Sequence, residues 1–110
     1  MASMNFDFNK IKRSFLNVTL KNGKSIVVKM PLKKTYEKAI AMKNIDEEEM
    51  DVSTAIEELA VICSEFLSNN MTKEKVTVKY ITENYDLEEM VMFLDYFVAF
   101  VSSAKNDPNS

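Results

Sequence analysis

The stretch Asp86-Leu-Glu-Glu-Met-Val-Met-Phe-Leu-Asp-Tyr-Phe-Val-Ala-Phe-Val101 decides the fold, because it predicts a helix with apolar side chains on two faces. A surface helix is normally polar on its far side, so this helix is either central in a bundle or half-covered by a partner. We expect the first face to be core, with Leu87, Leu94 and Val98 at its centre; its members are Leu87, Met90, Val91, Leu94, Val98 and Val101. We expect the second, roughly opposite stripe to contact another chain; its members are Met92, Phe93, Tyr96 and Phe100.

A β-hairpin is predicted upstream, where two β-rich runs, 15–20 and 24–30, flank Lys-Asn-Gly at 21–23. A two-residue Asn-Gly loop would place Lys29 opposite Leu16 on the apolar face. A three-residue loop, with Gly23 in the left-handed conformation, instead pairs Val18 with Ile26 and Leu16 with Val28. We therefore expect a type I turn with a glycine bulge, and helices covering one apolar face of the hairpin. That face consists of Leu16, Val18, Ile26, Val28 and Met30.

Two further helices are predicted between the hairpin and residue 68. Pro31 ends the second strand, and a helix over 33–43 follows, with an apolar side of Leu32, Tyr36, Ala39 and Ile40. The acidic run 46–49 lacks the spacing and the glycine of an EF-hand, so it is better explained as favourable charge at a helix N-terminus. The helix that follows runs to about Ser68, and its buried stripe is Val52, Ile56, Leu59, Ala60, Cys63, Phe66 and Leu67.

Residues 72–85 allow two interpretations. Their β-branched content is typical of a strand, but Thr72 is a possible N-cap and Val76 and Tyr80 have helical spacing. We expect a short helix here, and Asp86 as the cap of the terminal helix. The fold class is therefore α+β and mostly α, with an N-terminal β-hairpin on a bundle of three to four helices. Residues 1–13 are a lead-in, 14–104 a single domain, and 105–110 a disordered tail.

Charge is divided unevenly along the chain. Residues 1–44 carry ten Lys and Arg against two Asp and Glu, a net charge of +8, whereas residues 45–110 carry −11. Two solvated surfaces that attract each other within one fold would explain this asymmetry. Head-to-tail association of copies, or an acidic face for a basic partner, would explain it as well.

Residue types needed for most catalytic and metal sites are scarce. With no histidine and one cysteine, the chain lacks the usual zinc ligands and Ser-His-Asp or Cys-His arrangements. Its single glycine, in the hairpin turn, leaves none for a phosphate-binding loop. We expect Cys63 to be a small buried side chain, and we expect no enzyme activity, no cofactor, no metal, no nucleic-acid partner and no membrane span. A cytoplasmic protein that binds other proteins is the class that remains.

The order of the parts provides a resemblance. A basic hairpin with Lys-Asn-Gly at its tip is followed by Pro31 and a helix, an acidic linker, and Ile56-Glu-Glu-Leu-Ala-Val-Ile-Cys-Ser-Glu-Phe-Leu67. A Thr72-Lys-Glu-Lys-Val connection then leads to Tyr85-Asp-Leu-Glu-Glu-Met and Phe-Leu-Asp-Tyr-Phe at 93–97. Over residues 14–104 this arrangement resembles the small tail assembly chaperones of long-tailed (siphovirus-type) bacteriophages and prophages of Gram-positive bacteria.

The resemblance implies a role and partners. Such chaperones coat the tape measure protein, keep it soluble, help recruit tail tube subunits and leave the finished tail. Many are made in two lengths by ribosomal frameshifting, and none has catalytic residues to carry over. It would place the chain in the host cytoplasm as a homo-oligomer, with Met92, Phe93, Tyr96 and Phe100 as the candidate interface. The alternative is a small cytoplasmic adaptor or regulatory protein in which the same stripe forms a fixed homodimer.

Overall fold

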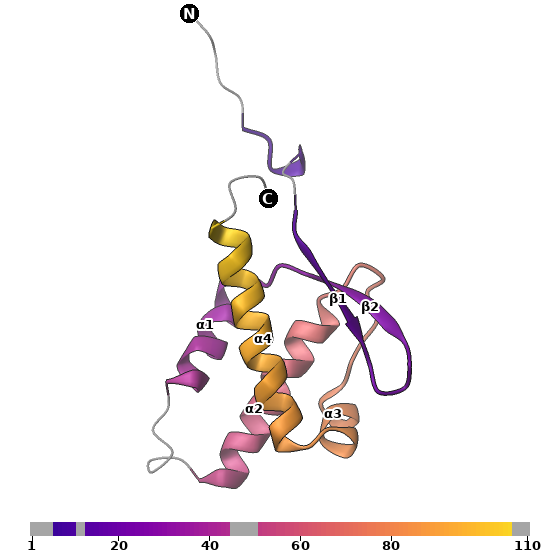
Figure 1. Cartoon of the computed structure of the whole chain (residues 1–110), viewed down its shortest axis with the longest axis vertical. Coiled ribbons are helices and arrows are strands. Elements are labelled where there is room, and N and C mark those ends of the chain that lie inside the picture. Colours follow the sequence, from indigo (N-terminus) through magenta and orange to yellow (C-terminus); the bar gives the residue numbers. More distant parts are fainter. Residues whose placement is uncertain (1–5, 11–12, 45–50, 107–110) are drawn as a thin grey trace, which may run out of the picture.

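The computed structural model describes residues 6–10, 13–44 and 51–106, and it confirms an α+β fold that is mostly α (Figure 1). Figure 1 shows helix α4 crossing in front of α2, with α1 on one side and the hairpin and α3 on the other. The elements in chain order are the short 3₁₀ turn η1 (Phe8–Lys10), β1 (Phe15–Thr19), β2 (Ser25–Lys29), α1 (Lys33–Lys43), α2 (Val52–Ser68), α3 (Val78–Asn84) and α4 (Leu87–Asn106).

The hairpin has the predicted register. Leu16 pairs with Val28 and Val18 with Ile26, so the apolar residues of both strands share one face. The Gly23 N–H donates to the Leu20 carbonyl at 2.9 Å, and Gly23 has a φ of +88°. That left-handed conformation is the one expected for a three-residue loop ending in a glycine bulge.

A short third segment extends the hairpin and ties it to the end of α2. The Lys29 N–H donates to the Asn69 carbonyl at 2.9 Å, and the Met71 N–H donates to the Val27 carbonyl at 2.9 Å. Residues 69–71 therefore bond to the edge of β2 that β1 leaves open. Two strands alone have marginal stability in water, and this contact adds backbone pairing and a helix to support them.

Residues 72–77 are not helical, so the prediction that Thr72 begins a helix is wrong: Thr72 lies in a turn, Lys73 has a left-handed φ of +58°, and residues 74–77 lead into α3 without helical structure. Helix α3 starts six residues later, where the Thr77 hydroxyl oxygen accepts a hydrogen bond from the Tyr80 N–H at 3.1 Å. The Ser68 hydroxyl bonds both the N–H and the carbonyl of Val76, at 2.9 and 3.0 Å. These bonds satisfy the N–H and the carbonyl of Val76 and compete with helix formation there.

Asn70 organises the turn that leads into this segment. It is a buried polar residue, and its side-chain amide donates to the carbonyls of Leu67 and Glu74 at 2.8 and 2.7 Å. Its carbonyl oxygen accepts from the Glu74 N–H and the Thr72 hydroxyl. All the bonds that this amide can readily make are formed, as burial of a polar group requires.

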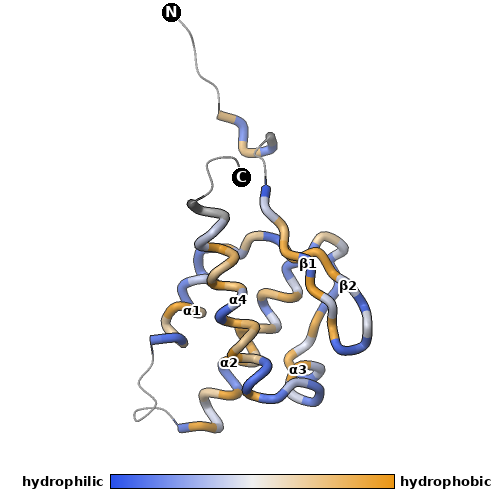
Figure 2. The backbone as a smooth tube through the Cα atoms, viewed as in Figure 1, coloured by the Kyte–Doolittle hydropathy of each residue, from blue (hydrophilic) through white to orange (hydrophobic). Residues whose placement is uncertain are grey.

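The centre of the core is an aromatic stack between α2 and α4. Phe66 and Phe97 are both fully buried, with ring centroids 4.0 Å apart and planes at 10°. Leu94 and Val98 are buried beside them, as predicted for the first face of α4, and so is Met90. Figure 2 shows apolar residues recurring along α2, α4 and the hairpin. Cys63 is buried among them, which confirms its predicted structural role.

Several apolar residues predicted to be core lie at the surface. Leu87 and Val91 of α4 are 43% and 42% exposed, because the buried face of the helix centres on Phe97, which belongs to neither predicted stripe. Leu32 and Val52, at the first turns of α1 and α2, are 75% and 65% exposed. Each lies where its helix begins, beyond the packed part of the bundle.

The charge asymmetry is compensated in part within the fold. Of five ion pairs among the described residues, four join a lysine before residue 44 to a carboxylate after residue 51. The interpretation as two mutually attracting surfaces of one fold is therefore supported. The four pairs are Lys21–Glu89 at 2.7 Å, Lys38–Glu65 at 3.1 Å, Lys43–Asp95 at 3.3 Å, and Lys24–Glu74.

The ends of the chain differ in part from expectation. Helix α4 continues to Asn106, two residues into the segment expected to be a disordered tail. Residues 107–110 and the acidic run 46–49 lie outside the described residues. Within the described part of the chain, no helix is both long and apolar enough to cross a membrane.

Candidate partner-binding surface

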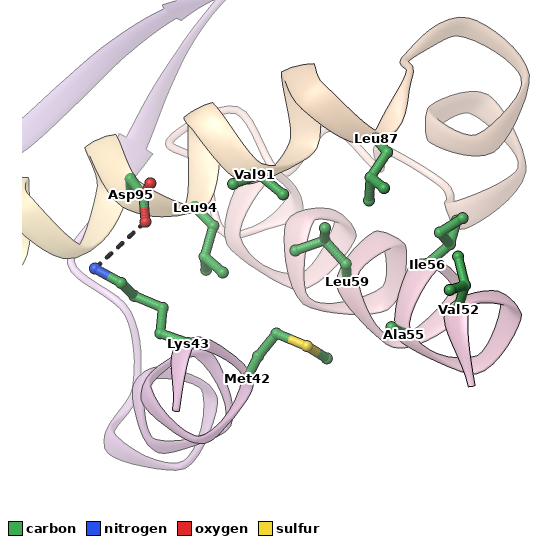
Figure 3. Close-up of a pocket in the computed structure, with 10 residues that line it drawn as sticks. All are labelled: Met42, Lys43, Val52, Ala55, Ile56, Leu59, Leu87, Val91, Leu94 and Asp95. Carbon is green, nitrogen blue, oxygen red and sulfur yellow. Dashed lines mark ion pairs between the residues drawn. The ribbon is translucent and has the colours of Figure 1, made fainter. Parts of the chain in front are cut away.

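An apolar groove lies between the end of α1, the first half of α2 and the first half of α4 (Figure 3). Its volume is about 440 Å³, which is within the range of pockets that bind ligands. Leu59 and Leu94 are buried in its floor, whereas Val52, Leu87 and Val91 are exposed. We call this feature the groove, and its lining residues are Met42, Lys43, Val52, Ala55, Ile56, Leu59, Leu87, Val91, Leu94 and Asp95.

The charged groups of the groove are paired with each other. Lys43 Nζ lies 3.3 Å from an Asp95 carboxylate oxygen, and Figure 3 shows this ion pair at one end of the groove. Both side chains remain partly exposed to solvent. The remaining lining is aliphatic or methionine, so the groove offers apolar surface and no unpaired charge to an occupant. Methionine adapts to irregular apolar partners, which suits a surface for protein segments.

The predicted interface stripe on α4 is divided by the fold. Met92 and Tyr96 are 65% and 64% exposed and form an apolar ridge next to the groove on the same helix. Phe93 and Phe100 are half-buried, and each ring centroid lies 5.7 Å from that of Phe97. Two of the four predicted residues are therefore available to a partner, and the other two support the central stack.

A second, smaller cavity of about 150 Å³ lies between the hairpin, α2, α3 and α4. Cys63 lines it, and burial raises the pKa of its thiol to about 12. Because the thiolate is the reactive form, this cysteine is inert near neutral pH. The Tyr85 hydroxyl accepts a hydrogen bond from the Lys21 N–H at 3.1 Å, and burial raises the pKa of this tyrosine.

Glu89 closes the other side of this small cavity. Hydrogen bonds from Lys21 Nζ at 2.7 Å and from the Asp86 N–H at 2.9 Å lower the pKa of its carboxyl. The Asp86 carboxylate in turn accepts from the Glu89 N–H at 2.8 Å. This reciprocal capping box confirms Asp86 as the cap of α4. Around the cavity, the polar groups bond to one another and hold secondary structure in place.

The described residues contain no group of three acidic or cysteine side chains close enough to hold a metal ion. Comparison with protein-family models, with curated proteins and with solved structures found no match to this chain.

Sequence reasoning missed the groove because it centred the buried face of α4 too far toward Leu87 and Val91 and left Phe97 out of it, although Met90, Leu94 and Val98 are buried as predicted. The spacing of Met90, Leu94, Phe97 and Val101 is 4, 3 and 4 residues, which is itself a helical stripe. A face centred on these residues leaves Leu87 and Val91 at its edge, where they now line the groove. No pattern in the sequence predicted that Met42 and Ala55 would line the groove.

Proposed function

We propose that this protein is a non-enzymatic tail assembly chaperone that binds the tape measure protein through the groove. The observation that carries the proposal is the apolar groove itself, with exposed aliphatic side chains along helices α2 and α4. Apolar surface grooves are sites at which amphipathic helices of partner proteins bind. The arrangement of parts that resembles tail assembly chaperones supplies the class of partner.

A helical segment with an apolar stripe is the occupant that suits the groove. Amphipathic helices bind in apolar grooves through side chains spaced three and four residues apart. A tape measure protein is long and largely helical, so it offers many such segments to many copies of a small chaperone. The ridge of Met92 and Tyr96 lies beside the groove and would remain free for a second partner, the tail tube protein.

Co-expression with the tape measure protein encoded in the same genome tests the proposal. We expect the chaperone to keep the tape measure protein in the soluble fraction and to copurify with it. Val91→Asp should abolish both effects, because it places a charge among apolar lining residues while its own side chain is already partly exposed. Leu32→Asp is the matched control, since Leu32 is exposed and lies outside the groove lining.

Three results would contradict the proposal. One is a genome without a tape measure gene, and another is a tape measure protein that stays insoluble beside the wild-type chain. The third is retained binding by Val91→Asp at an unchanged melting temperature. The adaptor alternative instead predicts a homodimer through the ridge, which Met92→Ser with Tyr96→Ser would convert to monomer without any client.

A further inference from the structure

Two aromatic side chains near the start of the described chain are unusually exposed. Phe6 and Phe8 are 74% and 72% exposed, and neither packs against the hydrophobic core. Their ring centroids lie 4.9 Å apart in an edge-on arrangement. Figure 1 shows the η1 turn standing away from the helices and the hairpin. Large aromatic side chains dominate the energetics of interfaces, so two adjacent exposed ones indicate a contact with something outside this chain.

Local hydrogen bonds stabilise the turn that follows Phe6. A carboxylate oxygen of Asp7 accepts hydrogen bonds from the Asn9 N–H at 2.9 Å and from its side-chain amide at 3.2 Å. We call Phe6–Asn9 the aromatic arm.

We propose that the aromatic arm of one copy occupies the groove of a second copy. The groove presents aliphatic carbon and the Met42 thioether, and thioether sulfur makes favourable contacts with aromatic rings. The summed formal charges around the two sites are opposite in sign: residues 6–13 carry three basic residues against Asp7, whereas Asp51, Glu88 and Asp95 in and beside the groove outnumber Lys43. Arg13 follows the arm, whereas Asp51 and Glu88 are the chain neighbours of the groove residues Val52 and Leu87, and all three charged side chains are exposed.

Arm and groove are different surfaces, so the contact is heterologous: every copy supplies one arm and accepts another. The arm would cover the apolar groove until a client displaces it. The inference rests on the groove of the proposed function, but its test contains no client. Loss of client binding with intact self-association, or the reverse, therefore separates the two proposals.

The test is size-exclusion chromatography with light scattering of the full chain over a range of concentrations. The wild type should associate increasingly with concentration, and 0.5 M NaCl should preserve the association because its main contacts are apolar. Phe6→Ser with Phe8→Ser (the arm variant) and Val91→Asp (the groove variant) should each weaken association by about tenfold or more. Leu32→Ser, which removes a comparably exposed apolar side chain elsewhere, should associate like the wild type.

Mixing the two defective variants provides the decisive result. The arm variant keeps a groove and the groove variant keeps an arm, so together they should form a one-to-one heterodimer that grows no further. Circular dichroism should show that both are folded, and Val52→Asp serves as a second groove variant. The inference is overturned if the wild type is monomeric throughout, as it would be with the arm in its own groove. It also fails if the arm variant still associates, or if the mixture stays monomeric while the wild type associates.

Discussion

Phe97 should contribute more to stability than any other residue of α4. Its ring is fully buried and stacked on Phe66 at 4.0 Å, and the ring centroids of Phe93 and Phe100 each lie 5.7 Å from its own. Truncation of a core phenylalanine to alanine costs about 3–5 kcal/mol. A chain of 110 residues has a total stability of about 5–15 kcal/mol. Phe97→Ala should therefore remove a large part of the free energy of unfolding, measured by urea denaturation and followed by circular dichroism.

A milder variant and an adjacent control refine this measurement. Phe97→Leu keeps an apolar side chain but loses the aromatic pairing, which should cost about 1–2 kcal/mol. Tyr96→Ala, one residue away on the exposed ridge, should change stability by about 0.5 kcal/mol or less. The reasoning is refuted if Phe97→Ala lies within about 1 kcal/mol of the wild type, or if Tyr96→Ala costs as much as Phe97→Ala.

Further measurements test the turns, the cysteine and the pH dependence. Gly23→Val should destabilise the domain by about 1–3 kcal/mol because of its positive φ, and an unchanged melting temperature would contradict this. Asn70→Ala should cost about 1–3 kcal/mol by leaving buried backbone groups unpaired; denaturation that matches the wild type would count against that assignment. Cys63 should react with a thiol reagent at neutral pH only on unfolding, given its pKa of about 12, and rapid labelling of the folded chain would disprove it. The fold lowers the pKa of Glu89, so the ionised Glu89 carboxylate stabilises the fold fully above its ordinary pKa of about 4.3, and this stabilisation is lost as the pH falls through the lower pKa of the folded state. Lys21→Met should reduce this loss of stability at acid pH. An acid-denaturation profile identical to that of the wild type would exclude the Lys21–Glu89 ion pair as its cause.

Local signals were sufficient for the hairpin and for the extent of two helices. The register of the hairpin followed from one glycine and the alternation of side chains, because a slip of one residue would turn Lys29 toward the core. The predicted helix over 33–43 and the predicted end of the next helix at Ser68 also agree with the structure. Pro31 precedes the first of these helices, and Asn69 follows the last residue of the second.

The orientation of α4 and the path of residues 72–77 required tertiary information. A helix that is apolar nearly all round has no periodic signal for which face is buried, and Phe66 on another helix decides that Phe97 is central. The extended path near Val76 depends on hydroxyl groups of α2, Ser64 and Ser68, that lie eight to twelve residues away. The groove arises where three helix segments leave a space, which no single segment encodes.

The stack of Phe66 on Phe97 also determines when, during synthesis of the chain, the core can form. A ribosome adds residues from the first end of the chain to the last, at about 5–20 residues per second. The second ring of the stack is therefore made about 1.5–6 s after the first. During that interval the apolar face of α2 lacks its partner helix, and the core can form only after residue 97 has been synthesised. Nascent chains should accordingly be most vulnerable to aggregation and proteolysis before residue 97 emerges, and any truncation upstream of it should be unable to fold.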